Sequence, residues 1–572
     1  MAHTHGVVLE ATLRDDGSVA KVQCTGEPGD PGTFRPETSA PDGVFPLDGL
    51  PLTYPGETSP PLADGKSDTW CGGFAFAVWD REGQTLRAYR DHYGARPLYY
   101  HASRERLLLA SEIPALVERL PNPGLDEIAV AEYLATGIPT EGRSFHKGIL
   151  RLSPASVLTA RRDGLSVERY WSPWTGAWMG STRAEDLDEV FRHLLGRAVR
   201  TTLADRSPTG MLLSGGVDSS GVLGMAASLA RSGAISRMPR VALTLAFEEL
   251  TQCDETSLAM RTAAEHGVPW RPVRVEDTSP LSHLDSFMTR LGEPSIVTVN
   301  IAPATAIYAA AQEAGARVLL DGHDADGIFT PSGAYLAELV LRFRWVRLAQ
   351  EWYALSRRHS QRRLVRECIT PLIAKFLPMR PTRIPGWIRP ELARRTGLRD
   401  RLRVHLPGAL FEEREAERVH AAPVGLALEG TRTLERLFGI EGRHPYFDPA
   451  LVRFVVSVPL DHRFARGHTK IMMRRALGNL LPHDLRSAVP KTSYRPYFDW
   501  TLRKYLGPRL EVMYKDGVRS LGDYVEESRL RPMLADALQG RSVDPALWRI
   551  VAMDRWIRAV LNEERHHETV SA

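Results

Sequence analysis

The chain has 572 residues, which is too long for one hydrophobic core, so we expect two or more domains. Its 43% hydrophobic and 25% charged residues exclude a disordered chain, and a net charge of +4 argues neither for nor against a nucleic-acid partner. The four cysteines have neither CxxC nor Cys/His spacing, which excludes a structural zinc motif and a disulfide framework.

Targeting and membrane signals are not found in the sequence. The first ten residues, MAHTHGVVLE, lack the basic and then apolar pattern of a secretory signal, and no apolar run is long enough to span a bilayer. We therefore expect a cytoplasmic protein without a membrane partner, in a reducing compartment that suits unpaired cysteines.

Residues 1–178 are predicted to form the first domain, built from short strands. Residues 26–66 are rich in Gly, Pro, Asp and Thr and are expected to form loop. Strand-like runs then follow at residues 71–80, 86–90, 98–101 and 107–110, with a helix beginning at residue 111. Short strands at such close spacing predict stacked β-sheets.

Residues 185–572 are predicted to form the second domain, in which strands alternate with helices. After an amphipathic helix at residues 186–203, strand-like runs occur at residues 211–213, 242–247, 271–275 and 317–320. This alternation predicts a doubly wound parallel sheet, which binds ligands at the carboxyl ends of its strands.

The segment SGGVDSS at residues 214–220 follows the first of these strands and predicts an anion site. Residues 214–216 allow a tight turn, and Ser219 lies at a helix start, where free backbone N–H groups and the helix dipole favour a phosphate. Asp218 would repel a phosphate unless a divalent cation lay between them, so we interpret it as a Mg²⁺ ligand. The alternative is a Gly-rich turn whose Asp caps the helix.

A second acidic segment, DGHDADG at residues 321–327, follows the strand-like run at residues 317–320. Because the carboxyl ends of parallel strands meet at one edge of a sheet, we interpret Asp326 as a second carboxylate directed at the same cation. The alternative for Asp326 is a structural role in an Asx-rich turn. For His323, a functional role and a structural role have equal weight.

Residues 335–420 are expected to be helical and are unusually basic. Between residues 341 and 380, ten Lys and Arg residues stand against Glu351 and Glu367. A solvated helix face and a docking surface for an acidic peptide or partner protein explain this equally well. The aromatic residues of the segment are expected in the core, namely Phe343, Trp345, Trp352 and Tyr353.

Several segments together resemble the asparagine synthetase family. The first domain carries GGFAFAVWD, RDHYGARPLYY and LLLASEIPALV, which are similar to that family's glutamine-hydrolysing domain. The second carries SGGVDSS, DGHDADG, GIEGRHPYFD, GHTK and VPKT in the family's order. The resemblance covers most of residues 70–500. It implies an α/β fold, with a glutaminase-like (Ntn-type) β-sandwich followed by an ATP-pyrophosphatase domain that has a doubly wound parallel sheet and a large helical part.

The resemblance also implies a site for ATP and Mg²⁺. Asp218 and Asp326 would hold the metal with the pyrophosphate of ATP. Lys491, in the VPKT segment, would stabilise the transition states of adenylation and acyl transfer, where charge develops on phosphate and carbonyl oxygens. The implied ATP and pyrophosphate site comprises Leu213, Ser214, Gly215, Gly216, Asp218, Ser219, Thr244, Asp321 and Gly322.

Three further residues are predicted to serve catalysis. Glu441 would organise the site through Arg443. His323 occupies a position that is Glu in asparagine synthetases and Tyr in β-lactam synthetases. Glu429 would act with His323 as the base that takes a proton from the attacking amine, or would be an exposed structural residue.

The sequence departs from the family at the glutaminase nucleophile. The family uses a cysteine that becomes the first residue after Met removal, whereas Met1 is here followed by Ala2, and the nearest cysteine is Cys24. We therefore expect that the first domain is a scaffold and that the attacking amine arrives with the substrate.

In some branches of the family the attacking amine arrives with the substrate. Of these, the sequence most resembles the lasso-peptide cyclases. The missing cysteine, His323 and the basic helical segment support that choice. It implies ATP-dependent adenylation of an Asp or Glu side chain of a precursor peptide and attack by its N-terminal amine, which forms a macrolactam. The alternatives are β-lactam or carbapenam ring closure and glutamine-independent amide ligation.

A lasso cyclase also implies partners. The precursor peptide is the substrate, and a leader-binding protein and a leader peptidase would act with the enzyme, without nucleic acid. An inactive family member that only binds peptide is disfavoured by the intact Asp218, Asp326 and Lys491. A tRNA-modifying ATP pyrophosphatase is disfavoured by the first domain.

Overall fold

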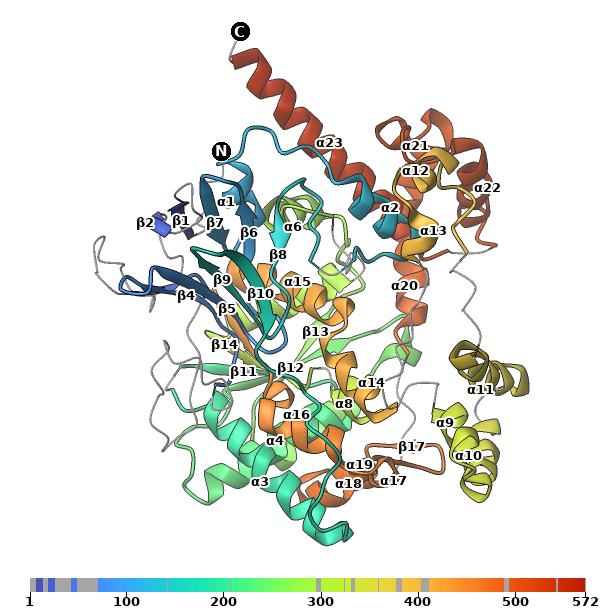
Figure 1. Ribbon diagram of the computed structural model, residues 1–572. Coiled ribbons are helices and arrows are strands. Elements are labelled where there is room, and N and C mark those ends of the chain that lie inside the picture. The colour runs from blue at the N-terminus through green and yellow to red at the C-terminus, as the bar shows by residue number, and fades with distance from the viewer. Residues whose placement is uncertain are drawn as a thin grey trace.

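The computed structural model describes most of the chain (Figure 1). The described residues are 7–13, 19–25, 43–48, 70–140, 142–205, 207–294, 300–323, 325–330, 335–357, 360–376, 383–402, 411–487, 493–541 and 544–570.

Two five-stranded antiparallel sheets form the N-terminal part of the molecule (Figure 1). Their strand orders are β2-β1-β7-β6-β8 and β10-β9-β5-β4-β3. Alternate residues are buried in a shared core, such as Leu9 and Ala11 of one sheet and Ala75 and Ala77 of the other, because successive side chains of a strand point to opposite faces. The strands are β1 (Val8–Leu13), β2 (Val19–Thr25), β3 (Gly43–Pro46), β4 (Ala75–Asp80), β5 (Thr85–Arg90), β6 (Tyr99–Ala102), β7 (Arg106–Ala110), β8 (Leu150–Arg151), β9 (Ser156–Arg161) and β10 (Gly164–Arg169).

The predicted β-sandwich is therefore confirmed, with two differences in detail. Strand β3 lies inside the segment that was expected to be loop, where it pairs with β4. Strands β9 and β10 form a hairpin beyond the predicted strands, and the β10 side chains are mostly exposed, so their sequence has little of the apolar alternation that marks a half-buried strand.

A five-stranded parallel sheet forms the centre of the C-terminal part. Its order is β13-β12-β11-β14-β15, and each neighbouring pair is parallel. The chain moves outward from β11 to β13 and then returns to the other side of β11, so the winding reverses between β11 and β14. Such a reversal is where doubly wound sheets bind ligands. The strands are β11 (Thr209–Leu212), β12 (Val241–Ala246), β13 (Trp270–Arg274), β14 (Val318–Leu320) and β15 (Glu441–Arg443).

Helices cover both faces of this sheet, which confirms the predicted doubly wound fold. Leu243 and Leu319 belong to one apolar core, and their neighbours Ala242 and Leu320 belong to another. The first core includes residues of α7 (Ile301–Glu313) and α15 (Ala422–Phe438), and the second includes residues of α3 (Ala184–Thr202) and α4 (Val217–Arg231).

The other helices complete these layers and the large helical part. They are α1 (Ile113–Val117), α2 (Glu127–Thr136), α5 (Thr256–Glu265), α6 (Leu284–Leu291), α8 (Ala325–Phe329), α9 (Tyr335–Leu341), α10 (Trp345–Ser356), α11 (Gln361–Phe376), α12 (Pro390–Arg395), α13 (Leu398–Arg401), α14 (Phe411–Glu417), α16 (Pro449–Ser457), α17 (Leu460–Arg463), α18 (Ile471–Leu477), α19 (His483–Arg486), α20 (Arg495–Thr501), α21 (Gly507–Asp516), α22 (Glu527–Leu538) and α23 (Ala546–Val570). A short hairpin, β16 (Phe464–Ala465) and β17 (His468–Thr469), precedes α18. No helix of the described ranges is long and apolar enough to cross a membrane.

The N-terminal and C-terminal parts share hydrophobic cores. Val130 and Tyr133 of α2 are buried in the same core as Val551 of α23, near the C-terminus. Phe145 makes an edge contact with Trp556 of α23, with ring centroids 5.6 Å apart. Apolar contacts therefore join the region of residues 130–145 to helix α23.

Helix α10 differs from the prediction for the basic segment. Phe343, Trp345 and Tyr353, which were expected in the core, are 76%, 54% and 69% exposed. The opposite face of α10 is the buried one, and it carries Glu351, Leu348 and Leu355 toward the rest of the protein. The expectation of a core position is therefore wrong for these three aromatic residues. The fourth, Trp352, is partly buried and packs against the core cluster of Leu336, Leu364 and Cys368.

Candidate functional site

The turn after β11 has the geometry of an anion site. Gly215 has a positive φ of 71°, which only glycine adopts readily, and α4 begins immediately afterwards with Gly216 as its N-cap. The Ser214 backbone N–H donates to the Ser219 hydroxyl at 3.1 Å, which holds the turn against the first turn of the helix. The N–H groups of the first turn of α4 and the helix dipole therefore favour a phosphate at this edge of the sheet.

The turn after β14 lies directly against this helix start. A Cβ atom added at Gly322 would be 2.6 Å from the Ser219 backbone nitrogen, a distance that side chains do not reach without displacement. The close approach therefore requires glycine at position 322. It brings the two strand ends together as expected for a winding reversal.

Lys470 joins the two predicted metal ligands. Its Nζ atom lies 2.5 Å from Asp218 Oδ2 and 2.6 Å from Asp326 Oδ1. Asp218 is in the first turn of α4 and Asp326 in the first turn of α8, so two helix starts and one cation meet at a single point. The sequence placed Lys470 in the GHTK segment without a role, and its proximity to both carboxylates could not be read from its distant position in the chain.

These carboxylates suit a magnesium ion that also binds phosphate oxygens. Mg²⁺ is held in proteins by one or two carboxylates, with the other positions filled by substrate phosphates and water. Within the described ranges, no group of three or more His, Cys, Asp and Glu residues would hold a metal alone. Asp218 and Asp326 therefore fit a metal that arrives with its nucleotide.

Asp321 is used inside the turn after β14. Its Oδ1 atom accepts the His323 backbone N–H at 3.0 Å and lies 2.8 Å from His444 Nδ1. Burial acts to raise the pKa of Asp321, but the neighbouring His444 and His323 outweigh it and hold that pKa below its ordinary value. Asp321 is thus an ionised residue that shapes the turn, while the His323 side chain is exposed at the strand end.

Thr244 and Leu213 lie in the sheet behind the turn. The Thr244 hydroxyl donates to the Leu213 carbonyl at 2.7 Å and accepts from Trp270 Nε1 at 3.0 Å, and the Thr244 side chain is buried. Thr244 therefore fixes the end of β11 from the neighbouring strand, and its hydroxyl is already used by these two partners.

Glu441 lies among arginines at the end of the sheet. It is 3.1 Å from Arg443 Nε and 3.4 Å from Arg96, which comes from the N-terminal part. Burial acts to raise the pKa of Glu441, but these arginines outweigh it and lower that pKa. Arg443 is also paired with Asp205 at 2.6 Å.

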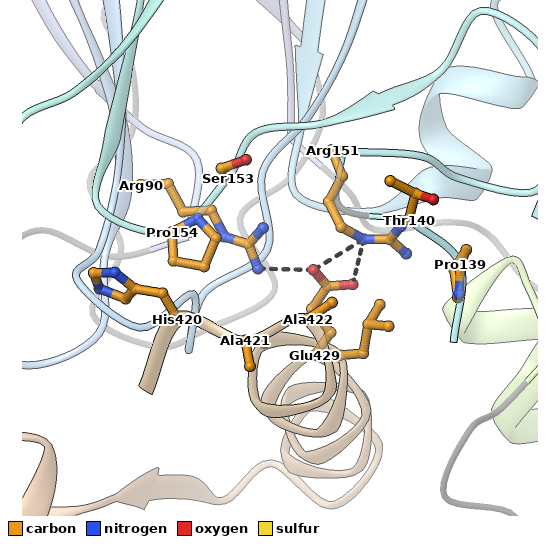
Figure 2. Close-up of a pocket in the computed structure, with 13 residues that line it drawn as sticks. Arg90, Pro139, Thr140, Arg151, Ser153, Pro154, His420, Ala421, Ala422 and Glu429 are labelled. Carbon is orange, nitrogen blue, oxygen red and sulfur yellow. Dashed lines mark hydrogen bonds and ion pairs between the residues drawn. The ribbon is translucent and has the colours of Figure 1, made fainter. Parts of the chain in front are cut away.

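Glu429 lies in a buried cluster between the two parts of the molecule, as Figure 2 shows. Arg90 Nη2 is 2.7 Å and Arg151 Nε 2.9 Å from its carboxylate, and the Tyr99 hydroxyl donates to it at 2.8 Å. Burial acts to raise the pKa of Glu429, but Arg151 and Arg90 outweigh it and lower that pKa.

The predictions for Glu429 need correction at two points. It is only 1% exposed, so the alternative of an exposed structural residue is wrong. A carboxylate held by two guanidinium groups and a hydroxyl, with a lowered pKa, is also a poor proton acceptor, and His323 is not among its described partners. The cavity beside it holds only about 20 Å³, room for about one water molecule and not for a substrate.

Lys491, the cation expected to stabilise the transition states, lies outside the described residues. Its role stays a prediction.

Fold and site together define a nucleotide-binding enzyme of the ATP-pyrophosphatase type, joined to an antiparallel β-sandwich. Residues 190–558 match the family model for asparagine synthase, and residues 66–171 match that for the glutamine amidotransferase domain. The chain therefore belongs to the asparagine synthase family, whose members form amide bonds with ATP.

Relatives with assigned names extend over much of the chain. Amidase chry2 of Gibberella zeae is 25% identical over 477 residues, which are 77% of this chain and 70% of that protein. Asparagine synthetase [glutamine-hydrolyzing] 3 of Bacillus subtilis is 26% identical over 450 residues, 74% of this chain and 68% of its own. Amidase chyE of Penicillium rubens is 30% identical over 279 residues, 47% of this chain and 41% of its own.

Proposed function

We propose that this enzyme adenylates an Asp or Glu side chain of a precursor peptide and joins it to the peptide's N-terminal amine, as lasso-peptide cyclases do. The observation that carries the adenylation half is the meeting of Asp218, Asp326 and Lys470 beside the turn at residues 214–220. Two carboxylates and a cation at a helix start suit a departing pyrophosphate with its magnesium ion.

The surroundings of the cysteines support an amine that comes from the substrate and not from glutamine. The thiols of Cys71, Cys253 and Cys368 are buried, and burial raises the pKa of Cys253 and Cys368, which makes both poor nucleophiles. Cys24 lies within strand β2. The N-terminal sandwich would then be a scaffold, and an amine carried by the substrate would take the place of ammonia from glutamine.

The proposed reaction has two steps, adenylation of the carboxylate and attack by the amine. A carboxylate oxygen of the peptide attacks the α-phosphorus of ATP, and pyrophosphate leaves with its bridging oxygen. The N-terminal nitrogen then attacks the activated carbonyl carbon, AMP leaves with the former carboxylate oxygen, and the nitrogen loses a proton. Asp218 and Asp326 would hold Mg²⁺, which would neutralise the pyrophosphate, and Lys470 would contact the same leaving group.

The partners follow from this chemistry. The N-terminal amine of the core peptide exists only after the leader has been removed, so a leader peptidase must act first. A leader-binding protein would bring the precursor to both enzymes. No nucleic-acid partner is proposed.

The test is the ATP-dependent mass change of trimmed candidate core peptides. We expect a loss of one water per peptide and one AMP formed, both abolished in Asp326→Asn and retained in the surface control Asp163→Asn. A leader-bearing precursor that cyclises equally well would contradict the proposal. Turnover of a small β-amino acid without turnover of peptides would move the assignment to β-lactam ring closure.

A further inference from the structure

A groove of about 840 Å³ lies between residues 250–252 and helix α20 with the π-helical turn that follows it. We propose that this groove binds an acidic, extended segment of the peptide substrate. The identity of the ligand as a peptide rests on the proposed function, whereas its charge and shape follow from the groove itself.

Both walls of the groove are fixed by one buried residue, Glu276. Its carboxylate accepts the backbone N–H groups of Glu248 at 2.7 Å, Glu249 at 3.0 Å and Leu250 at 2.8 Å, which hold the first wall. Its carbonyl oxygen accepts the Tyr505 hydroxyl at 2.5 Å and Lys504 Nζ at 3.3 Å, which hold the second. A groove fixed in this way loses little conformational entropy when a flexible ligand binds.

The lining is cationic. It carries Arg495, Arg503 and Lys504 against one acid, Asp499, which is paired with Arg495 at 2.9 Å. No ion pair within the described ranges uses Arg503 or Lys504, and both side chains are exposed. Two positive charges therefore remain for carboxylates of a ligand.

An aromatic surface lies next to these charges. Lys504 Nζ is 4.2 Å from the centroid of the half-buried Trp500 ring, which is also part of the lining. The π-helical turn at residues 502–506 places Lys504 beside this ring, and such turns are frequent at functional sites. The combination suits an acidic chain with apolar or aromatic side chains.

The first wall of the groove continues along the chain to a residue that lies beside the turn at residues 214–220. Residues 250–252 continue to Glu255, whose carbonyl oxygen would be 3.0 Å from a Cβ atom added at Gly215. The second wall joins the same segment, because Cys253 Sγ donates to the Ser493 carbonyl at 3.5 Å. A peptide lying in the groove would therefore have its neighbouring residues close to the turn at residues 214–220.

The experiment compares two short fluorescent peptides that differ only in Glu against Gln residues, with binding measured by anisotropy in the absence of ATP. We expect the Glu peptide to bind more tightly than the Gln peptide, and Arg503→Glu to weaken Glu-peptide binding about tenfold. The control Arg104→Glu makes the same charge change in the turn between β6 and β7 and should leave binding unchanged. Arg503→Gln, a smaller change, should give an intermediate affinity.

Three results would overturn the inference. These are equal affinity for both peptides, equal effects of Arg503→Glu and Arg104→Glu, and preferential binding of a labelled oligothymidylate at the same groove. Because binding is measured without ATP, the experiment distinguishes failure of the groove proposal from failure of the proposed function. Charge-dependent peptide binding without any AMP formation would support the groove and contradict the proposed function. Cyclisation with an unchanged KM in Arg503→Glu would support the proposed function and contradict the groove.

Discussion

Lys470 has a left-handed backbone conformation, with φ 60°, that is unfavourable for a residue with a side chain. Such a conformation costs about 1–2 kcal/mol and persists only where surrounding contacts fix it. Here the contacts are the two ion pairs to Asp218 and Asp326. The strain at position 470 is therefore located at the point where the proposed leaving group would bind.

Replacement of Lys470 by methionine separates two effects of its charge. Without a competing ammonium group, Mg²⁺ should bind the two carboxylates more tightly in the absence of ATP, while AMP formation should fall about 10²-fold. Calorimetric titration measures the affinity for Mg²⁺, and an AMP assay measures the rate of adenylation. Lys515→Met, at an exposed i,i+4 ion pair, is the control. Weaker Mg²⁺ binding in Lys470→Met would contradict this arrangement.

His444 and Asp321 give the protein a pH-dependent stability. Burial acts to lower the pKa of His444, but its partner Asp321 outweighs it and raises that pKa above the ordinary value. Protonated His444 therefore stabilises the fold fully below its unfolded-state pKa, and this contribution is lost as the pH rises through the raised value. The stability difference between wild type and His444→Gln should shrink as the pH rises above about 6.5, the ordinary pKa of histidine, and through the raised pKa of His444. A difference that grows with pH in thermal unfolding would refute the pairing.

Helix α10 supports the hairpin that precedes Lys470. The fully buried carboxylate of Glu351 accepts the backbone N–H groups of Arg466 and Gly467, each at 2.8 Å, in the turn between β16 and β17. Arg347, one turn earlier on α10, donates to the Phe464 carbonyl at 2.8 Å. The inner face of α10 thus fixes the segment that delivers Lys470 to the site.

Glu351→Ala should therefore reduce AMP formation although Glu351 does not contact the site. We expect a loss of about tenfold in kcat, because small displacements of a positioned group are costly. Glu351→Gln retains acceptor and donor atoms and should restore most of the rate. Glu412→Ala, which removes a partly buried partner of Arg342, serves as the control. Equal rates for Glu351→Ala and wild type would show that the hairpin is positioned by other contacts.

At the scale of the whole molecule, the two parts are joined by buried charges as well as by shared apolar cores. Besides the contacts of Glu429, Arg432 is paired with Asp48 at 2.6 Å, and Arg96 with Glu435 at 3.0 Å. Each pair links the N-terminal part to α15. Because a buried charge without its partner is very unfavourable, separation of the two parts would require water to enter at all these positions.

Glu429→Ala tests this junction. It leaves Arg90 and Arg151 buried without their common carboxylate and should lower the free energy of unfolding by about 3–5 kcal/mol. The variant that remains folded at low temperature should keep its kcat, because the carboxylate of Glu429 is already held by Arg90, Arg151 and Tyr99. Calorimetry and an AMP assay give the two quantities. A stable variant with a greatly reduced kcat would instead restore the role of catalytic base.

The sequence predicted the elements that follow simple periodic patterns. Strands β11 to β14 and the segments at residues 214–220 and 321–327 are local features, and the meeting of these segments follows from the predicted doubly wound topology. The edge strand β15 was not predicted, because its three residues, Glu441–Arg443, have no apolar pattern. Partners from distant segments were not predictable, because no local pattern states that Lys470 lies between Asp218 and Asp326, or that Glu429 meets Arg90 and Arg151. The exposed aromatic face of α10 was missed because apolar periodicity identifies a face without showing what covers it.

The most direct test of carboxylate adenylation followed by amide formation uses a peptide whose acceptor side-chain carboxylate carries oxygen-18. The account predicts AMP with one labelled oxygen, unlabelled pyrophosphate, and a macrolactam that keeps the other labelled oxygen in its new amide. Labelled inorganic phosphate formed together with ADP would contradict it, because the carboxylate would then have attacked the γ-phosphorus. Unlabelled AMP would contradict it as well, because ATP cleavage would then be uncoupled from activation of the peptide.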